Sequence, residues 1–201
     1  MRNIPKIEKG NTYHIYNRGI NGEDIFKEKR NYSHFLNRWQ DFIAPVTDTY
    51  AYCLLKNHFH FLLRVKNEDV VFVDEVTSKS KILDPTQQFS NFFNSYAQSI
   101  NKAGNRTGSL FEHPYRRIKV DNEAYFARLV TYIHYNPQKH GFVDDYKQYP
   151  YSSYASHLSS KPTKLNRREV IDWFGNENKF VEFHSSYRDF KDLGDLAYEA
   201  D

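Results

Sequence analysis

Alternating apolar and polar residues predict a β-strand over residues 56–64. Side chains alternate between the two faces of a strand, so His58 and His60 point the same way, roughly 7 Å apart along the chain. The opposite face carries the residues expected to be buried: Phe59, Phe61, Leu63 and Val65. Two neutral imidazoles on one rigid face can share a divalent metal ion. An H-x-H pair is equally typical of histidines that hydrogen-bond to neighbours on a half-buried sheet, so it defines no site by itself.

The rest of the pattern predicts an α+β fold. Period-two alternation indicates three further strands: residues 11–16, 47–55 and 115–120. Apolar residues at helical spacing indicate one helix that starts at Asn31 and that Pro45 closes, and a second that Asp84 or Thr86 caps and Gly104 ends. The order is that of a ferredoxin-like βαββαβ antiparallel sheet with helices on one face. The other face of the sheet would stay available for a ligand.

A third helix should begin at Asp121 or Asn122 and end at the Asn136-Pro137 pair, because the residue before a proline disfavours helical geometry. Its buried stripe is formed by Phe126, Leu129, Val130 and Ile133. Tyr132 and Asn136 are four residues apart and share one flank of that stripe. Tyr132 is therefore expected to be held by packing and partly exposed. A plain packing role is the alternative, since the chain has 16 tyrosines.

Length and composition fit one domain with an appendage. The chain has 201 residues, and we expect a ferredoxin-like domain over residues 1–155 and a C-terminal helical appendage over 156–201. Aromatic residues make up 17% of the chain, which is enough for an aromatic core. The single cysteine excludes a disulfide framework, and no apolar run suits a membrane span or a signal peptide. These features predict a cytoplasmic protein.

The net charge of +3 decides nothing about nucleic acid, but the charge is unevenly distributed. Residues 102–119 contain only one acidic residue, Glu112, and five basic ones: Lys102, Arg106, Arg116, Arg117 and Lys119. This local excess predicts contacts with phosphates. Phe111 and Tyr115 are suited either to stacking on unpaired bases or to core packing, and core packing is favoured for Phe111. The basic residues of the appendage either bind nucleic acid or form a solvated face, and the sequence favours the solvated face slightly.

Four stretches, in this order, resemble the single-tyrosine HUH transposases of small bacterial insertion sequences, and most of all the REP-associated tyrosine transposases. They are residues 57–63, 108–112, 116–120 and 132–141. The opening segment, with Asn17-Arg18-Gly19 and Phe26, also looks like this family. The resemblance covers roughly residues 11–155. Each motif alone is weak, and their ordered combination is specific.

The resemblance implies a site and a reaction. His58 and His60 would bind Mg²⁺ or Mn²⁺, Asn136 would be the third ligand, and Tyr132 would be the nucleophile. The reaction would cleave and rejoin single-stranded DNA near a hairpin through a covalent 5′-phosphotyrosine, in the bacterial cytoplasm at the nucleoid. Charge and resemblance together predict the DNA-binding residues: Arg18, Lys102, Arg106, Tyr115, Arg116, Arg117 and Lys119. Family members act as monomers or homodimers, and the sequence does not separate the two.

The main alternative is a domesticated or inactive hairpin-specific DNA-binding protein on the same fold. A phosphoesterase of the type with two H-x-[ST] motifs is disfavoured, because the chain has one H-x-H and no second such motif at a matching place. A structural zinc site is disfavoured by the single cysteine and by the absence of a Cys or His cluster at ligand spacing.

Overall fold

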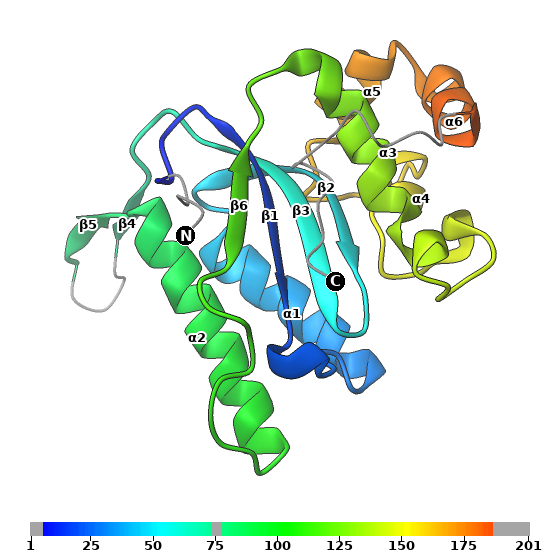
Figure 1. Ribbon diagram of the computed structural model, residues 1–201. Helices are drawn as coiled ribbons and strands as arrows, with labels where there is room; N and C mark the ends of the chain where they lie inside the picture. The colour runs from blue at the N-terminus through cyan, green and yellow to red at the C-terminus, as the bar shows by residue number, and fades with distance from the viewer. Residues whose placement is uncertain (1–5, 74–77, 187–201) are drawn as a thin grey trace.

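The computed structural model describes residues 6–73 and 78–186 (Figure 1). At its centre is an antiparallel sheet in the strand order β2-β3-β1-β6. Its strands are β1 (Thr12–Arg18), β2 (Thr47–Leu54), β3 (His58–Val65) and β6 (Arg116–Lys119). This order and these directions confirm the predicted ferredoxin-like sheet. Strand β1 runs two residues beyond its predicted end, and Arg18 therefore lies directly opposite His58.

The helices agree with the predicted order. They are η1 (Ile20–Gly22), α1 (Lys29–Phe42), α2 (Pro85–Ala103), α3 (Glu123–Lys139), η2 (Tyr146–Gln148), α4 (Tyr154–His157), α5 (Arg167–Phe174) and α6 (Glu177–Ser186). Strands β4 (Val71–Val73) and β5 (Ser80–Ile82) form a small separate hairpin. Within the described residues, no helix is both long and apolar enough to cross a membrane.

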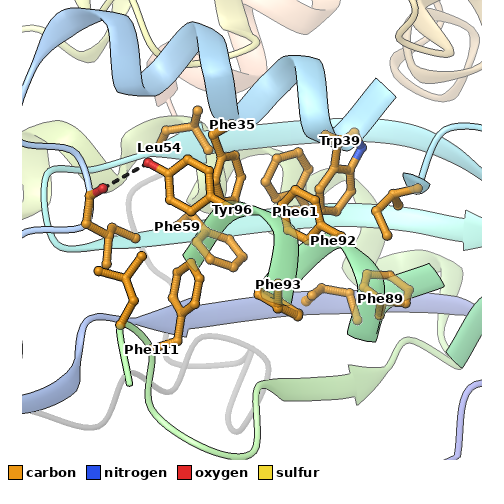
Figure 2. Packing of buried hydrophobic residues seen from close by; sticks show 14 of the residues in the cluster. Phe35, Trp39, Leu54, Phe59, Phe61, Phe89, Phe92, Phe93, Tyr96 and Phe111 are labelled. Carbon is orange, nitrogen blue, oxygen red and sulfur yellow. Dashed lines mark hydrogen bonds between the residues drawn. The ribbon is translucent and has the colours of Figure 1, made fainter. Parts of the chain in front are cut away.

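Helices α1 and α2 cover one face of the sheet, and the space between them and the sheet is filled with aromatic rings (Figure 2). Phe59 and Phe61 point from β3 into this layer and are fully buried, as their alternation with the histidines predicts. Trp39 of α1 stacks on Phe61 with ring centroids 3.6 Å apart. Asp84 accepts a hydrogen bond from the Gln87 backbone N–H and so caps α2. This layer anchors β3 and leaves its histidines on the other face.

Helix α3 packs against β2 and β3 on that other face, so the expectation of an open ligand-binding face is wrong for this part of the sheet. Leu62 of β3 is buried against Leu129 and Ile133 of α3 in a second apolar cluster. The C-terminal helices add Val170 and Phe180 to this cluster. The physical reason is that the sheet presents apolar side chains on both faces, and the stripe on α3 buries them. Cavities remain at the two ends of this face.

The end of α3 corrects a second prediction. The helix passes through Pro137 and ends at Lys139, and the His140 N–H still donates to the Asn136 carbonyl at 3.0 Å. A proline in the last turn removes one backbone hydrogen bond, which the rest of a 17-residue helix tolerates. As a result, Tyr132, Asn136 and His140 form a row at helical spacing of four.

Candidate active site

The two histidines of β3 lie on one face, as the alternation predicts. The ring centroids of His58 and His60 are 5.3 Å apart and the rings are perpendicular. His60 is almost completely buried at 1% exposure, and His58 is half-buried at the edge of a cavity. The buried phenylalanines on the reverse side of the strand fix its position, so the imidazoles are held by a rigid element.

The row on α3 lies over these histidines. The Tyr132 ring is 6.0 Å from the His60 ring and edge-on to it, and the His140 ring is 5.0 Å from the His58 ring. Asn136 lies between Tyr132 and His140 in this row, on the same flank. Tyr132 thus lies beside His60 of its own chain.

Tyr132 is 1% exposed, so the expectation of a partly exposed tyrosine is wrong. It is buried because α3 packs flat on the sheet, with the Tyr132 ring beside both His14 and His60. Lys139, the last residue of α3, donates a hydrogen bond to the Tyr132 hydroxyl at 3.5 Å. Its ammonium lies 5.0 Å from the centre of the Tyr132 ring. An ammonium at this place stabilises negative charge that develops on the phenolic oxygen.

Each histidine is oriented by a hydrogen bond at Nδ1. His58 Nδ1 lies 2.8 Å from the Asn57 side-chain oxygen, an acceptor, so Nδ1 carries the proton and Nε2 keeps its lone pair. His60 Nδ1 lies 3.0 Å from Nε2 of buried His14 on β1. If His60 uses its Nε2 lone pair toward a ligand, its Nδ1–H donates to His14. The sequence pattern alone did not single out His14 as a site residue, although its place in an alternating strand was the available signal.

The donor set fits a divalent cation with mixed ligands. Among the described residues, no group of three or more His, Cys, Asp or Glu could hold a metal. Asn136 is fully buried and its side-chain N–H donates to the Tyr132 carbonyl at 2.9 Å. Its Oδ1 accepts no hydrogen bond from any part of the chain that the structure describes. A buried carbonyl oxygen of this kind is suited to a cation.

A cavity of about 200 Å³ opens beside the histidines. Basic side chains enter it from three elements: Arg18, Arg116 and His140. Glu112, also at its wall, accepts a hydrogen bond from Arg18 Nε at 2.6 Å and fixes the guanidinium. A cavity lined by two guanidiniums and imidazoles suits the phosphates of a nucleic-acid strand.

The seven predicted DNA-binding residues do not form one surface. Only Arg18 and Arg116 reach the cavity. Arg117 points to the opposite face of β6, where its guanidinium lies 4.9 Å from the centre of the Tyr115 ring. Burial raises the pKa of Tyr115, which stacks on Phe89 in the aromatic layer. The sequence grouped these residues by proximity, and the alternation of the strand separates them.

The other basic residues of the set also lie away from the cavity. Arg106 is held by an ion pair with Glu23 at 3.0 Å, and Lys119 lies 3.4 Å from Asp121. Lys102 is exposed near the end of α2. These three are separated from the histidine pair, and any contact they make with DNA would lie outside the cavity.

A solved structure shares the fold of this chain. It is that of a REP-associated tyrosine transposase bound to a REP hairpin, with a TM-score of 0.60. That match covers 81% of this chain and 89% of the other at 16% identity, so it concerns the fold alone. No family model matches the chain.

Sequence similarity then identifies the family. A putative REP-associated tyrosine transposase of Haemophilus influenzae is 30% identical to the chain over 132 residues. The match covers 64% of this chain and 68% of the relative. The chain belongs to the REP-associated tyrosine transposases, as its motifs predicted.

Proposed function

We propose that the chain cleaves and rejoins single-stranded DNA next to a hairpin, with Tyr132 as the nucleophile. The observation that carries this proposal is the position of the Tyr132 ring, 6.0 Å from the His60 ring of the same chain. Family membership supports a transposase, and the relative of similar fold is bound to a REP hairpin. The basic cavity beside the histidines supplies a place for the strand.

In the proposed reaction, Tyr132 Oη attacks the phosphorus of the scissile phosphodiester. The phenol gives up its proton to water, the bond between phosphorus and the 3′ oxygen breaks, the 3′ oxygen takes a proton from water, and the 5′ phosphate stays attached to the tyrosine. A 3′ hydroxyl that later attacks the same phosphorus releases the tyrosine and rejoins the strand. Lys139 stabilises the phenolate in both directions, because its ammonium donates to the same oxygen.

His58, His60 and Asn136 would hold Mg²⁺ or Mn²⁺. Bound there, the ion would polarise the scissile phosphate as a Lewis acid. Imidazole and amide donors suit Mn²⁺ better than Mg²⁺, which prefers an all-oxygen shell. Arg18, fixed by Glu112, and Arg116 would hold the phosphates on either side of the scissile one.

The test is a labelled hairpin oligonucleotide with single-stranded flanks, incubated with the chain and Mn²⁺. A protein–DNA band that survives denaturation is expected from the wild type. The Tyr132→Phe and His58→Ala variants should give none, and Tyr132→Phe should still bind the hairpin. Hairpin binding without any covalent band in the wild type would instead identify an inactive DNA-binding protein.

A second experiment tests whether one chain carries a complete site, as the Tyr132–His60 proximity supports. Equal amounts of Tyr132→Phe and His60→Ala are mixed before the hairpin is added. A monomer that uses its own tyrosine gives no covalent band from the mixture. If the mixture restores the band, the tyrosine serves a partner's histidines, and the working form is a dimer.

A further inference from the structure

A second cavity, of about 320 Å³, lies at the far end of the sheet face that carries the histidines. Thr12, at the start of β1, lines this cavity, whereas Arg18, at the end of β1, lines the first. Arg64 lies opposite Thr12 in the sheet register and also lines the second cavity. Tyr16 is the nearest β1 residue that lines the first cavity, and it is four strand residues from Thr12, which is about 13 Å.

An exposed indole forms one wall of this cavity. Trp173 of α5 is 41% exposed, although it packs on the buried ring of Phe126. The Tyr50 ring lies 6.3 Å from it at a shallow angle of 30°. These two rings form a floor that fixes the indole, and its exposed part borders the cavity. A fixed, exposed aromatic face is a platform on which a flat ring can stack.

The charges around this cavity disfavour a phosphate. Arg64 is its basic residue, and the guanidinium lies 3.8 Å from the Asp48 carboxylate and 3.6 Å from that of Glu169. Asp121, at the rim, adds a further negative charge and is highly exposed. The rim therefore offers hydrogen-bond donors and acceptors without a net positive charge. A neutral ring with a polar edge matches this environment, and a phosphate does not.

We propose that this cavity binds one unpaired nucleobase, stacked on Trp173, from the same strand that enters the active site. This inference rests on the proposed function and extends it. Its volume is at the low end of the roughly 300 to 1,000 Å³ of small-ligand pockets, which suits one base and not a duplex. At 3.4 Å per stacked nucleotide, the span between the cavities corresponds to about four nucleotides, or fewer if the strand is extended. The C-terminal appendage would thus take part in DNA recognition.

The test is an abasic scan of the unpaired flank of the hairpin oligonucleotide, with binding followed by fluorescence anisotropy. In the wild type, loss of the base at one flank position should weaken binding about five- to 100-fold. Trp173→Ala should bind the intact oligonucleotide as weakly as the wild type binds the abasic one. Removal of the same base should then cause no further loss of affinity in this variant. Trp173→Phe keeps a stacking surface and should restore most of the affinity.

The matched control is Phe72→Ala, which removes an aromatic residue of similar exposure, 47%, that does not line this cavity. Its abasic scan should match the wild type. Thermal unfolding checks that Trp173→Ala is folded. If no flank position is coupled to Trp173 while the hairpin still binds and the covalent band still forms, the nucleobase site is excluded and the proposed function stands. A chain that binds no hairpin overturns both.

Tryptophan fluorescence gives a second readout that needs no loss of affinity. The chain has two tryptophans, and Trp39 is 1% exposed and hydrogen-bonded to Thr49. Quenching by the oligonucleotide should therefore come from Trp173, and it should disappear in Trp173→Phe. An unchanged emission spectrum in the wild type on saturation with the oligonucleotide would contradict stacking on Trp173.

Discussion

His14 Nε2 lies 3.0 Å from His60 Nδ1, and both rings are 99% buried. A histidine that binds a metal through one nitrogen usually donates its other N–H to a neighbour, which fixes its tautomer and orientation. We predict that His14→Leu weakens Mn²⁺ binding about 10- to 100-fold, because His60 then loses its acceptor. Isothermal titration of the DNA-free chain with Mn²⁺ measures this directly.

The control is His14→Gln, whose side-chain oxygen can accept the same hydrogen bond. It should bind Mn²⁺ within a few-fold of the wild type. Equal Mn²⁺ affinity in His14→Leu and the wild type would show that the His14–His60 hydrogen bond does not orient the ligand. Thermal unfolding of both variants separates this effect from a general loss of structure.

The contrast between His14 and the β3 histidines shows what local pattern can predict. His58 and His60 were found because strand alternation is local, and Tyr132 and Asn136 because helical spacing is local. His14 precedes His60 by 46 positions and meets it only because β1 pairs with β3 in the sheet. His140 was missed because the helix was expected to end at Pro137. The burial of Tyr132 depends on how α3 docks, which no local pattern specifies.

A second prediction concerns Lys139, which donates to the Tyr132 hydroxyl at 3.5 Å. Lys139→Gln should slow formation of the covalent band about three- to tenfold, a modest effect because the lysine is exposed and water screens its charge. Single-turnover rates at saturating Mn²⁺ measure it.

Lys139→Arg keeps the charge and should react at a rate close to that of the wild type. Arg128→Gln is the matched control, since it removes a positive charge from the same helix, where the guanidinium lies 5.9 Å from the Tyr125 ring. If Arg128→Gln and Lys139→Gln slow the reaction equally, the effect is due to net charge and not to the contact with Tyr132.

A third prediction uses two neighbouring arginines on opposite faces of β6. Arg116 lines the cavity, and Arg117 packs over the Tyr115 ring. Arg116→Ala should weaken binding of the single-stranded flank and reduce the slope of log affinity against log salt by about 0.7, as for one lost phosphate contact. Arg117→Ala should leave that slope unchanged. Anisotropy titrations over a range of salt concentrations distinguish the two, and equal slopes for both variants would contradict a strand in the cavity.

A fourth prediction follows from the buried histidines that join the C-terminal helices to α3. His134 Nδ1 lies 2.9 Å from His184 Nε2, and its Nε2 lies 2.7 Å from the Ser153 hydroxyl. Burial lowers the pKa of His134 well below 6.5. Burial likewise lowers the pKa of His157 to about 4. These imidazoles are neutral in the folded chain, and an unfolded chain would protonate them at a higher pH.

The sign follows from this difference in proton uptake. Near and below pH 6.5 the unfolded state binds more protons than the folded state. The stabilisation by the neutral imidazole is therefore complete above that pH, and the free energy of unfolding falls as the pH is lowered. For His157 alone, the free energy of unfolding that is lost between about pH 7 and pH 5 is roughly 2 kcal/mol.

His157→Gln should reduce the difference in unfolding free energy between these two pH values by that amount. Urea unfolding at both values measures it, with exposed His113→Gln as a control that should keep the wild-type difference. An unchanged difference in His157→Gln would mean that His157 is protonated in the folded chain as readily as in the unfolded one.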